Sequence, residues 1–234
     1  MKSPRLLDLY CCAGVGAIGY QQAGFHVTGI DNTRYSTYAG DDHLVADALE
    51  VLADTAYLRQ FDAIHASPPC QAFSTANAQF RLAGKNYPDY IQATRAGLEA
   101  AGRPYIIENV PQAPIRPDLV LYGWMFGLHV LRRRHFELGH WWAMQPGVPQ
   151  RIGSIASRDF VSVFGKCGYR KNKHWPPDWR PKFQKATILD TWHYAMGISE
   201  THRFRDIELS QGIPPAYTNY IGQQLFNTLH RTAP

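Results

Sequence analysis

The sequence has few cysteines, and their spacing excludes two common uses of this residue. Only four of the 234 residues are cysteine, and none of them forms the CxxC spacing of a structural zinc site. Cys11 and Cys12 are adjacent, so they cannot easily pair with each other. We therefore expect free thiols in a reducing cytoplasm and no bound metal.

Long apolar runs are also missing. No run is long enough to span a membrane, and the first residues lack the basic-then-apolar pattern of a secretion signal. Charged residues make up only 18% of the chain and hydrophobic residues 45%, which is an ordinary globular composition. The length suits one sizeable domain with at most a small appendage. The net charge of +5 permits a polyanionic partner, although a basic surface often serves only solubility.

The first half of the chain alternates short apolar runs with helix-like stretches. The apolar runs predict four buried strands, Leu6–Tyr10, His26–Ile30, Ala63–Ala66 and Tyr105–Ile107. The stretches between them predict three helices, Gly16–Ala23, Ala48–Leu58 and Tyr90–Ala101. This alternation predicts an α/β fold with a mostly parallel sheet and helices on both faces. Such sheets bind ligands at the carboxyl ends of their strands.

The character of the sequence changes near residue 139. Residues 139–186 are rich in Trp, Pro, Gly, Lys and Arg without a clear period, which predicts a small irregular basic lobe. Regular patterning resumes at residue 187, and a helix is predicted around Gly222–His230. We therefore expect a main domain at residues 1–138, the lobe at 139–186 and a C-terminal segment at 187–234.

A loop of small residues follows the first predicted strand, from Asp8 to Gly19. It leads into a helix, whose N-terminal N–H groups favour a carboxylate or phosphate. Asp31 ends the next strand, where acidic residues hold nucleotide ribose. A tight turn without a ligand is the alternative, but the acidic residue favours a cofactor site. Asp47 precedes a predicted helix, so it is either an N-cap or a contact on the adenine side.

Two further strand ends carry reactive side chains. Cys70 follows Pro68 and Pro69, which stiffen the backbone beside a side chain that must be held in one position. A thiolate is a strong nucleophile when its pKa is lowered, whereas a buried, inert cysteine is the alternative. Glu108 ends an apolar strand, where desolvation should raise its pKa and let it donate a proton. A loop or cap residue is the alternative there.

Three consecutive arginines lie within the segment Leu131–Glu137. If this segment is a strand, Arg132 and Arg134 lie on one face. They could then hold a phosphate or a planar base through two hydrogen bonds each. A solvated basic edge strand is the alternative.

In this order, the segments resemble the C5-cytosine DNA methyltransferases, especially the compact forms found in phages. Ser67–Gln71 is similar to the family's Pro-Cys-Gln catalytic loop, and Glu108–Val110 is similar to its Glu-Asn-Val motif. Arg132–Arg134 is similar to the family's alternate-arginine motif, and Ile213–Gly222 to the C-terminal motif that completes the cofactor pocket. The basic lobe is the variable part between these matches.

The resemblance implies a Rossmann-like class I methyltransferase fold, with S-adenosylmethionine as the methyl donor and no metal. Cys70 would attack carbon 6 of a flipped cytosine, while Glu108 would hold and protonate N3. Asn109 would orient this loop, and Arg132 and Arg134 would secure the base and the nucleophile's loop. Carbon 5 would take the methyl group, a base would remove its proton, and Cys70 would leave.

The resemblance also implies which residues form the cofactor pocket. They are Tyr10, Cys12, Gly14, Val15, Asp31, Asp47, Pro69 and Tyr220. Cys12 and Val15 stand where the family commonly has glycine, so both add bulk near the methionine end of the cofactor. That bulk could reduce affinity or favour an altered cosubstrate.

The basic lobe mixes cations with aromatic side chains, as nucleic-acid surfaces do. The residues expected to contact DNA are Arg170, Lys171, Lys173, Trp175 and Trp179. A lobe of this size should read few base pairs.

Taken together, the sequence predicts a monomeric enzyme that methylates carbon 5 of cytosine in double-stranded DNA at a short target sequence. It would act in the cytoplasm, that of a bacterial host if a phage encodes it. One alternative is a C5 methylase of free pyrimidine nucleotides, against which the basic aromatic lobe speaks. The other is a DNA-binding protein with a decayed or altered cofactor pocket, which only Cys12 supports.

Overall fold

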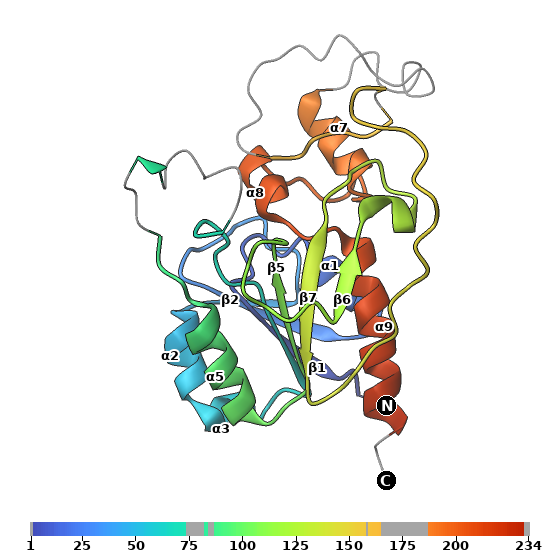
Figure 1. Ribbon diagram of the computed structural model, residues 1–234. Coiled ribbons are helices and arrows are strands. Elements are labelled where there is room, and N and C mark those ends of the chain that lie inside the picture. Colours follow the sequence, from blue (N-terminus) through green and yellow to red (C-terminus); the bar gives the residue numbers. More distant parts are fainter. Residues whose placement is uncertain (1, 74–81, 84–86, 158, 165–186, 232–234) are drawn as a thin grey trace.

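The computed structural model describes residues 2–73, 82–83, 87–157, 159–164 and 187–231. A seven-stranded sheet with the order β3-β2-β1-β4-β5-β7-β6 forms the centre of the molecule, and helices cover both of its faces (Figure 1). All strand pairs are parallel except the two that β7 makes with β5 and β6. The predicted α/β fold with a mostly parallel sheet is confirmed. The greater part of the predicted basic lobe, 165–186, lies outside the described residues.

The seven strands include the four that the apolar runs predict. Their bounds are β1 (Arg5–Leu9), β2 (His26–Asp31), β3 (Asp42–Val45), β4 (Ala63–Ala66), β5 (Tyr105–Asn109), β6 (Leu119–Leu121) and β7 (Arg134–Gly139). The prediction lacks β3 and β6 because β3 is a largely exposed edge strand and β6 has only three residues. β1 ends at Leu9 because Tyr10 has a φ of 60°, outside the range of a strand.

Four regions predicted as helical contain helices. The helices are α1 (Ala17–Gln22), α2 (Ala48–Ala53), α3 (Thr55–Leu58), α5 (Ile91–Ala101), α7 (Ile188–Ala195), α8 (Asp206–Gln211) and α9 (Pro215–Arg231), with a 3-10 turn η2 (Gly123–Phe126). Of these, α7 and α8 were not predicted. The helix predicted at 48–58 is divided at Asp54, whose side chain caps α3 by accepting a hydrogen bond from Tyr57 N. α9 begins well before Gly222, at a proline, which suits the first turn of a helix.

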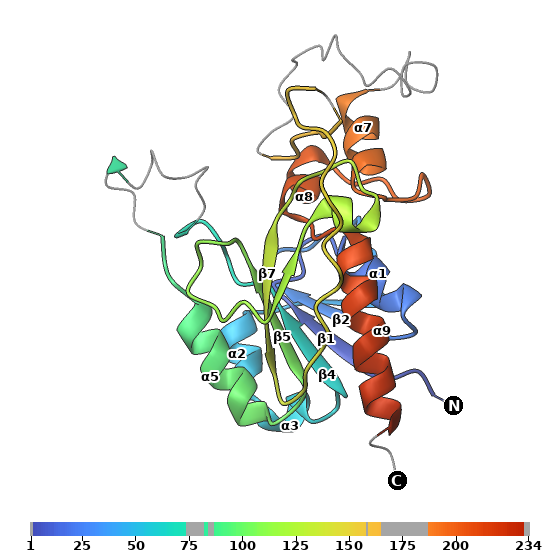
Figure 2. The same cartoon turned by 45° about the vertical axis from the view of Figure 1, so that its right-hand side comes forward.

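Each face of the sheet has its own apolar core. α1 and α9 cover one face, where Tyr20 and Tyr217 are fully buried, and α2, α3 and α5 cover the other (Figure 2). A side chain at Gly19 of α1 would lie 2.0 Å from the carbonyl oxygen of Pro215, so glycine allows α1 and α9 to approach closely. The C-terminal helix thereby packs against the start of the chain.

A third apolar cluster lies beyond the carboxyl edge of the sheet. Here Trp192 of α7 and Leu209 of α8 pack with Ala13 and Val15 from the loop after β1. α7 and α8 therefore stand over the edge at which a parallel sheet binds ligands (Figure 1). Within the described part of the chain, no helix is both long and apolar enough to cross a membrane.

Candidate active site

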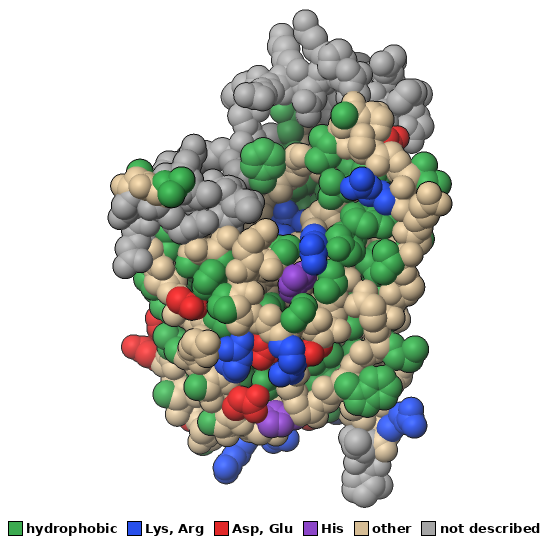
Figure 3. Space-filling model, viewed as in Figure 1, with side chains coloured by type: hydrophobic (Ala, Val, Ile, Leu, Met, Phe, Trp, Pro, Cys, Tyr) green, Lys and Arg blue, Asp and Glu red, His purple; other side chains and the backbone are tan. Residues whose placement is uncertain are grey.

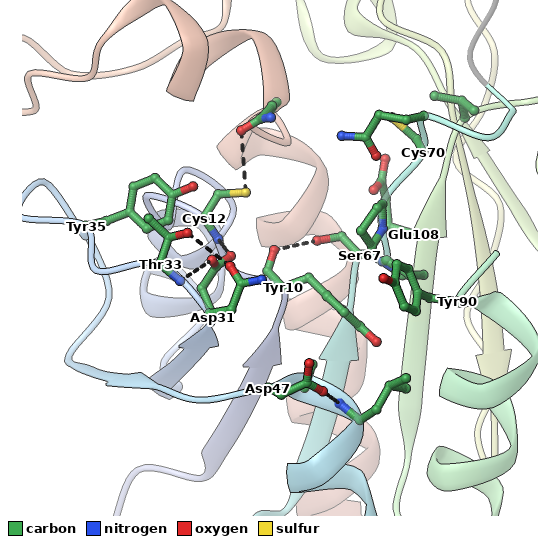
Figure 4. Close-up of a pocket in the computed structure, with 18 of the residues that line it drawn as sticks. Tyr10, Cys12, Asp31, Thr33, Tyr35, Asp47, Ser67, Cys70, Tyr90 and Glu108 are labelled. Atoms are coloured by element: carbon green, nitrogen blue, oxygen red, sulfur yellow. Dashed lines mark hydrogen bonds between the residues drawn. The ribbon is translucent and has the colours of Figure 1, made fainter. Parts of the chain in front are cut away.

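An open pocket of about 340 Å³ lies at the carboxyl edge of the sheet. Eight of the residues named from the sequence line it, namely Tyr10, Cys12, Asp31, Asp47, Pro69, Cys70, Glu108 and Arg134. Figure 4 shows its two ends: Cys70 and Glu108 lie at one end, and Asp31, Cys12 and Tyr35 lie at the other. Five named residues, Gly14, Val15, Asn109, Arg132 and Tyr220, are not in its lining.

Glu108 and Arg134 form a buried ion pair at one end of the pocket. Arg134 Nε lies 2.7 Å from Glu108 Oε1, and both side chains are largely buried. Burial raises the pKa of Glu108, while the charges of Arg134 and Arg132 oppose this effect. The pKa is shifted in the direction that a strand-end carboxyl predicts, so Glu108 can hold a proton at a higher pH than an exposed glutamate.

Cys70 lies half-buried in the same wall of the pocket. Burial raises the pKa of its thiol, and Glu108 adds to this effect, whereas Arg134 lowers the pKa. The side chain is therefore a neutral thiol at rest, although nucleophilic attack needs the thiolate. The thiolate must form during the reaction, because this environment does not stabilise it beforehand.

Asn109 connects the cysteine loop to the sheet. Its Nδ2 donates a hydrogen bond to the Pro68 carbonyl at 2.9 Å, and its Oδ1 accepts one from Val110 N at 2.9 Å. Asn109 is buried at the end of β5 and does not line the pocket. It restrains the Pro68–Cys70 loop from behind, which is the contact that an orienting residue needs.

A strand over this segment would place Arg132 and Arg134 on one face, but the structure does not have them there. β7 begins at Arg134, and Arg132 precedes it with a φ of 31°. The buried guanidinium of Arg132 donates instead to the carbonyls of Ser210 at 2.7 Å, Gly212 at 3.0 Å and Val163 at 2.9 Å. Arg134 faces Glu108, whereas Arg132 holds the end of α8.

The two carboxylates at the other end of the pocket accept backbone hydrogen bonds. Asp31 accepts from Cys12 N at 3.0 Å through one oxygen and from Thr33 N at 3.0 Å through the other (Figure 4). Asp47 caps α2 by accepting from Leu49 N at 2.7 Å, and it also lines the pocket. Both interpretations of Asp47 are therefore compatible with its position, and the cap fixes its orientation.

Cys12 occupies a backbone conformation that favours glycine. Its φ is 48°, and its Sγ donates to Gln211 Oε1 at 3.7 Å. Burial raises the pKa of the thiol to about 12, so Cys12 is neutral. Val15, the second departure from the family pattern, lies in a smaller adjoining cavity and packs against Gly212. Gly14 has a φ of 74° and shapes the turn without lining the pocket.

Tyr220 does not line this pocket, in contrast to the place in the cofactor site that the resemblance implies. Its hydroxyl donates to the Met144 carbonyl at 2.8 Å, and its ring contacts Phe126. α9 turns Tyr217 and Ile221 toward the sheet, which leaves Tyr220 on another side of the helix. The C-terminal part of the chain reaches the pocket through Ser210 and Gln211 instead.

Several lining residues were missed in the sequence analysis. They lie in four separate segments of the chain. These residues are Asn32, Thr33, Tyr35, Ser67, Gln71, Tyr90, Ser210 and Gln211. Gln211 lies two residues before the Ile213–Gly222 motif, and Ser67 and Gln71 are the first and last residues of the Ser67–Gln71 motif, so these three had a family motif as a signal. The others follow from how the loops meet in space.

The named DNA contacts, Arg170, Lys171, Lys173, Trp175 and Trp179, lie outside the described residues. The described cysteines, Cys11, Cys12 and Cys70, are free thiols. In the part of the chain that the structure describes, no group of three or more His, Cys, Asp or Glu side chains could hold a metal ion.

Comparison with known proteins relates the chain to one family. Residues 4–113 match the family model of the C-5 cytosine-specific DNA methylases. A mutant of Spodoptera frugiperda DNMT2 matches in structure with a TM-score of 0.57 and 14% identity, over 96% of this chain and 100% of that one. A SAM-dependent methyltransferase from Agrobacterium tumefaciens matches with a TM-score of 0.30 and 15% identity, over 46% of this chain and 39% of that one. No curated protein matches the chain. The likeness to DNMT2 shows a shared fold.

Proposed function

We propose that the chain, whose residues 4–113 match the model of the C-5 cytosine-specific DNA methylases, methylates cytosine in DNA and that Cys70 forms a covalent bond to the cytosine during the transfer. The family match supports a DNA (cytosine-5-)-methyltransferase that uses S-adenosylmethionine. The roles of individual residues and the duplex substrate are our proposal.

The grouping of Cys70, Glu108 and Arg134 in one wall of the pocket carries this proposal. A nucleophile and a proton donor beside each other can act on two atoms of the same ring. The cofactor would occupy the opposite end, between Asp31 and Asp47 (Figure 4). The base and the methyl donor would then meet within one cavity.

Glu108 would begin the reaction by holding and protonating N3 of the cytosine. Its raised pKa keeps the proton available, and protonation of N3 makes carbon 6 more electrophilic. Cys70 gives its proton to solvent water as its sulfur bonds to carbon 6, and the electron pair of the ring double bond moves toward carbon 5. Carbon 5 then carries enough electron density to accept a methyl group.

S-adenosylmethionine supplies the methyl group on an electrophilic sulfonium. Once carbon 5 is methylated, a base removes the carbon-5 proton and the double bond to carbon 6 re-forms. The sulfur of Cys70 leaves with its bonding electrons, which restores the enzyme. One difficult substitution at an unreactive aromatic carbon is thereby divided into easier steps.

Arg134 and Asn109 would keep this geometry in place before the substrate binds. Arg134 fixes the carboxyl of Glu108 through the 2.7 Å ion pair, and its charge also lowers the pKa of Cys70 against the effect of burial. Asn109 holds the loop that carries Cys70. Such preorganisation saves the cost of ordering these groups during the reaction.

Asp31 and Asp47 would recognise the nucleoside part of the cofactor. Each carboxylate oxygen has two acceptor sites, so an oxygen that accepts one backbone N–H can still accept from a ligand. Asp31 would take ribose hydroxyls, and Asp47 would take the adenine amino group. Cys12 and Gln211 would lie near the methionine end.

The proposed substrate is double-stranded DNA, and the proposed active form is a monomer. Carbon 6 cannot be reached inside a base stack, so the cytosine must be flipped out of the duplex. The unstacking costs a few kcal/mol and would be repaid by contacts in the pocket.

The test uses duplex DNA in which 5-fluorocytosine replaces the target base. Fluorine at carbon 5 cannot be removed as a proton, so the covalent adduct should accumulate and survive denaturing electrophoresis. We expect an adduct whose peptide map identifies Cys70, and bisulfite sequencing should find methylation of normal DNA. Cys12→Ser is the matched control and should still form the adduct. An active preparation that forms no adduct would overturn the covalent mechanism.

A further inference from the structure

Two arginines and two aromatic rings gather at the carboxyl edge of the sheet, beside the pocket. Tyr122 follows the last residue of β6, and Arg133 precedes the first residue of β7. Leu121 pairs with Arg134 in the sheet, so Tyr122 and Arg133 lie at the end where Arg134 meets Glu108. The edge that carries the catalytic side chains thus continues onto this group.

The four side chains form two stacked cation–ring pairs. The rings of Tyr122 and Trp124 have centroids 4.2 Å apart. The guanidinium carbon of Arg133 lies 5.6 Å from the centre of the Tyr122 ring, and that of Arg151 lies 5.7 Å from the centre of the Trp124 ring. These distances suit cation–π contact. We call these residues, Tyr122, Trp124, Arg133 and Arg151, the arginine–aromatic surface.

The charge of this surface is not compensated by described acidic side chains. Arg133 and Arg151 are exposed, and neither forms an ion pair with a described residue. Asp159 follows Arg151 by eight residues in the chain, but its side chain accepts hydrogen bonds from Ser154 and Ser157 and forms no ion pair with Arg151. Arg95, by contrast, is paired with Glu137.

The space-filling view agrees with this distribution of charge. In Figure 3, Lys and Arg side chains lie among hydrophobic ones on the upper part of this face. Asp and Glu side chains gather mainly on its lower part, toward the opposite end of the sheet. Lys and Arg side chains also lie among the acidic ones on the lower part, so the upper part differs mainly in having few acidic side chains.

We propose that the arginine–aromatic surface binds phosphates of the substrate DNA beside the flipped cytosine. A guanidinium binds phosphate oxygens through two parallel hydrogen bonds. The ring beneath each guanidinium restrains the long side chain, so less conformational freedom is lost when it binds. A duplex whose cytosine occupies the pocket must cross this edge, which makes the surface continuous with the proposed active site. This inference rests on the proposed function and adds where the DNA backbone lies.

The main test is a salt titration of duplex binding by the double variant Arg133→Ala/Arg151→Ala. Each phosphate contact that is lost should reduce the slope of log affinity against log salt by about 0.9. Loss of two contacts should therefore weaken binding about 30-fold at 0.15 M salt and very little near 1 M. The KM for DNA should rise, while the affinity for S-adenosylhomocysteine should stay unchanged.

Arg5→Ala is the matched control. Arg5 also stacks on a ring, with its guanidinium carbon 4.7 Å from the centre of Phe61, and its removal takes away one positive charge, as each change in the double variant does. It begins β1 and so lies at the amino edge of the sheet, far from the proposed DNA path. We expect its salt slope to equal that of the wild type.

The outcomes separate this inference from the proposed function. If the wild type methylates duplex DNA and the double variant keeps its salt slope, the surface does not contact phosphates, and only this inference fails. An equal loss of affinity at all salt concentrations with a lowered melting temperature would show that the surface is packing, and it would also overturn the inference. A wild type that neither binds nor methylates a duplex would overturn both.

Discussion

The two ends of the pocket hold their acidic side chains in opposite ways. Asp31 is half-buried and Asp47 is exposed, and each accepts hydrogen bonds from two backbone N–H groups. Glu108 is buried, and an arginine faces it. The backbone thus orients the carboxylates at one end, whereas burial and a single cation act on the carboxyl at the other.

This difference suits one end of the pocket to binding the cofactor and the other end to the chemical reaction. Backbone donors hold a carboxylate in one orientation, which suits an acceptor for hydroxyl and amino groups of a cofactor. Burial raises the pKa of Glu108, which suits a group that must carry a proton. The same type of functional group therefore takes different roles because its surroundings differ. Four pairs of variants can break or sharpen this comparison.

The largest effect is expected from the two pocket cysteines. Cys70→Ser should abolish methylation, because a hydroxyl is a far poorer nucleophile than a thiolate. Cys12→Ser changes the same atom at the cofactor end and should keep most of the activity, since a hydroxyl can still donate to Gln211 as the thiol does. Transfer of labelled methyl groups to DNA measures both. Substantial activity in Cys70→Ser would contradict the assignment of the nucleophile.

The next effect concerns Glu108. Glu108→Gln keeps the shape but cannot donate the same proton, so the rate should fall by about 10²–10⁴-fold. The matched variant is Glu137→Gln, which removes a carboxylate that Arg95 binds at 2.7 Å outside the pocket. It should lower the melting temperature and leave the rate per folded molecule near that of the wild type.

The pH dependence sharpens this test. Glu108 acts in its protonated form, and burial raises its pKa. The advantage of the wild type over Glu108→Gln should therefore be greatest at low pH. It should shrink as the pH rises through the pKa of Glu108, because the wild type then loses the proton that the variant lacks at every pH. A rate ratio that is independent of pH would show that Glu108 does not transfer a proton.

Arg132 and Arg134 should respond differently to the same change. Arg132→Lys removes a planar donor from three buried carbonyls, so we expect a loss of about 2–3 kcal/mol of unfolding free energy. The affinity for S-adenosylhomocysteine should fall as well, because Arg132 holds the turn that carries Gln211. Arg134→Lys should mainly lower the rate. Thermal unfolding, calorimetry and kinetics on both variants distinguish these effects, and identical profiles would contradict the division of roles.

The smallest effect separates the two roles of Asp47. Asp47→Ala removes the cap of α2 and should cost about 1 kcal/mol of stability. Asp54→Ala removes the cap of α3, outside the pocket, and should cost about the same. Only the first should weaken cofactor binding in a calorimetric titration. If both leave that affinity unchanged, Asp47 is a cap alone.

Much of the fold and half of the site follow from local sequence signals. The buried strands are predicted because each is a short apolar run with turn residues at its end. Cys70 and Glu108 were found because each stands at the carboxyl end of such a strand, where a parallel sheet brings its ligand-binding residues together. β3 was not predicted because its edge position leaves most of its residues exposed, so its sequence lacks the apolar pattern of a buried strand.

The errors have a shared physical cause. Arg132 was expected to lie beside Arg134 on a strand, but its φ of 31° turns the chain before β7 begins. Tyr220 was expected in the cofactor pocket, but the packing of α9 against the sheet decides the direction of each side chain on the helix, and Tyr220 contacts Met144 instead. Neither the rotation of a helix nor the residue at which a strand begins is encoded within the few residues of a motif.

The sequence by itself determined the chemistry of the site and the order of its parts along the chain. A nucleophilic cysteine, a strand-end glutamate and the acidic residues at the end of β2 and before α2 can be identified without coordinates, because each depends on neighbours within a few positions. Only the tertiary structure decided which arginine faces Glu108 and which residues close the cofactor end. Arg132 donates a hydrogen bond to Gly212, 80 residues later in the chain, and Cys12 donates one to Gln211, 199 residues later. Such partners depend on how α8 packs over the sheet, and no local pattern specifies that packing.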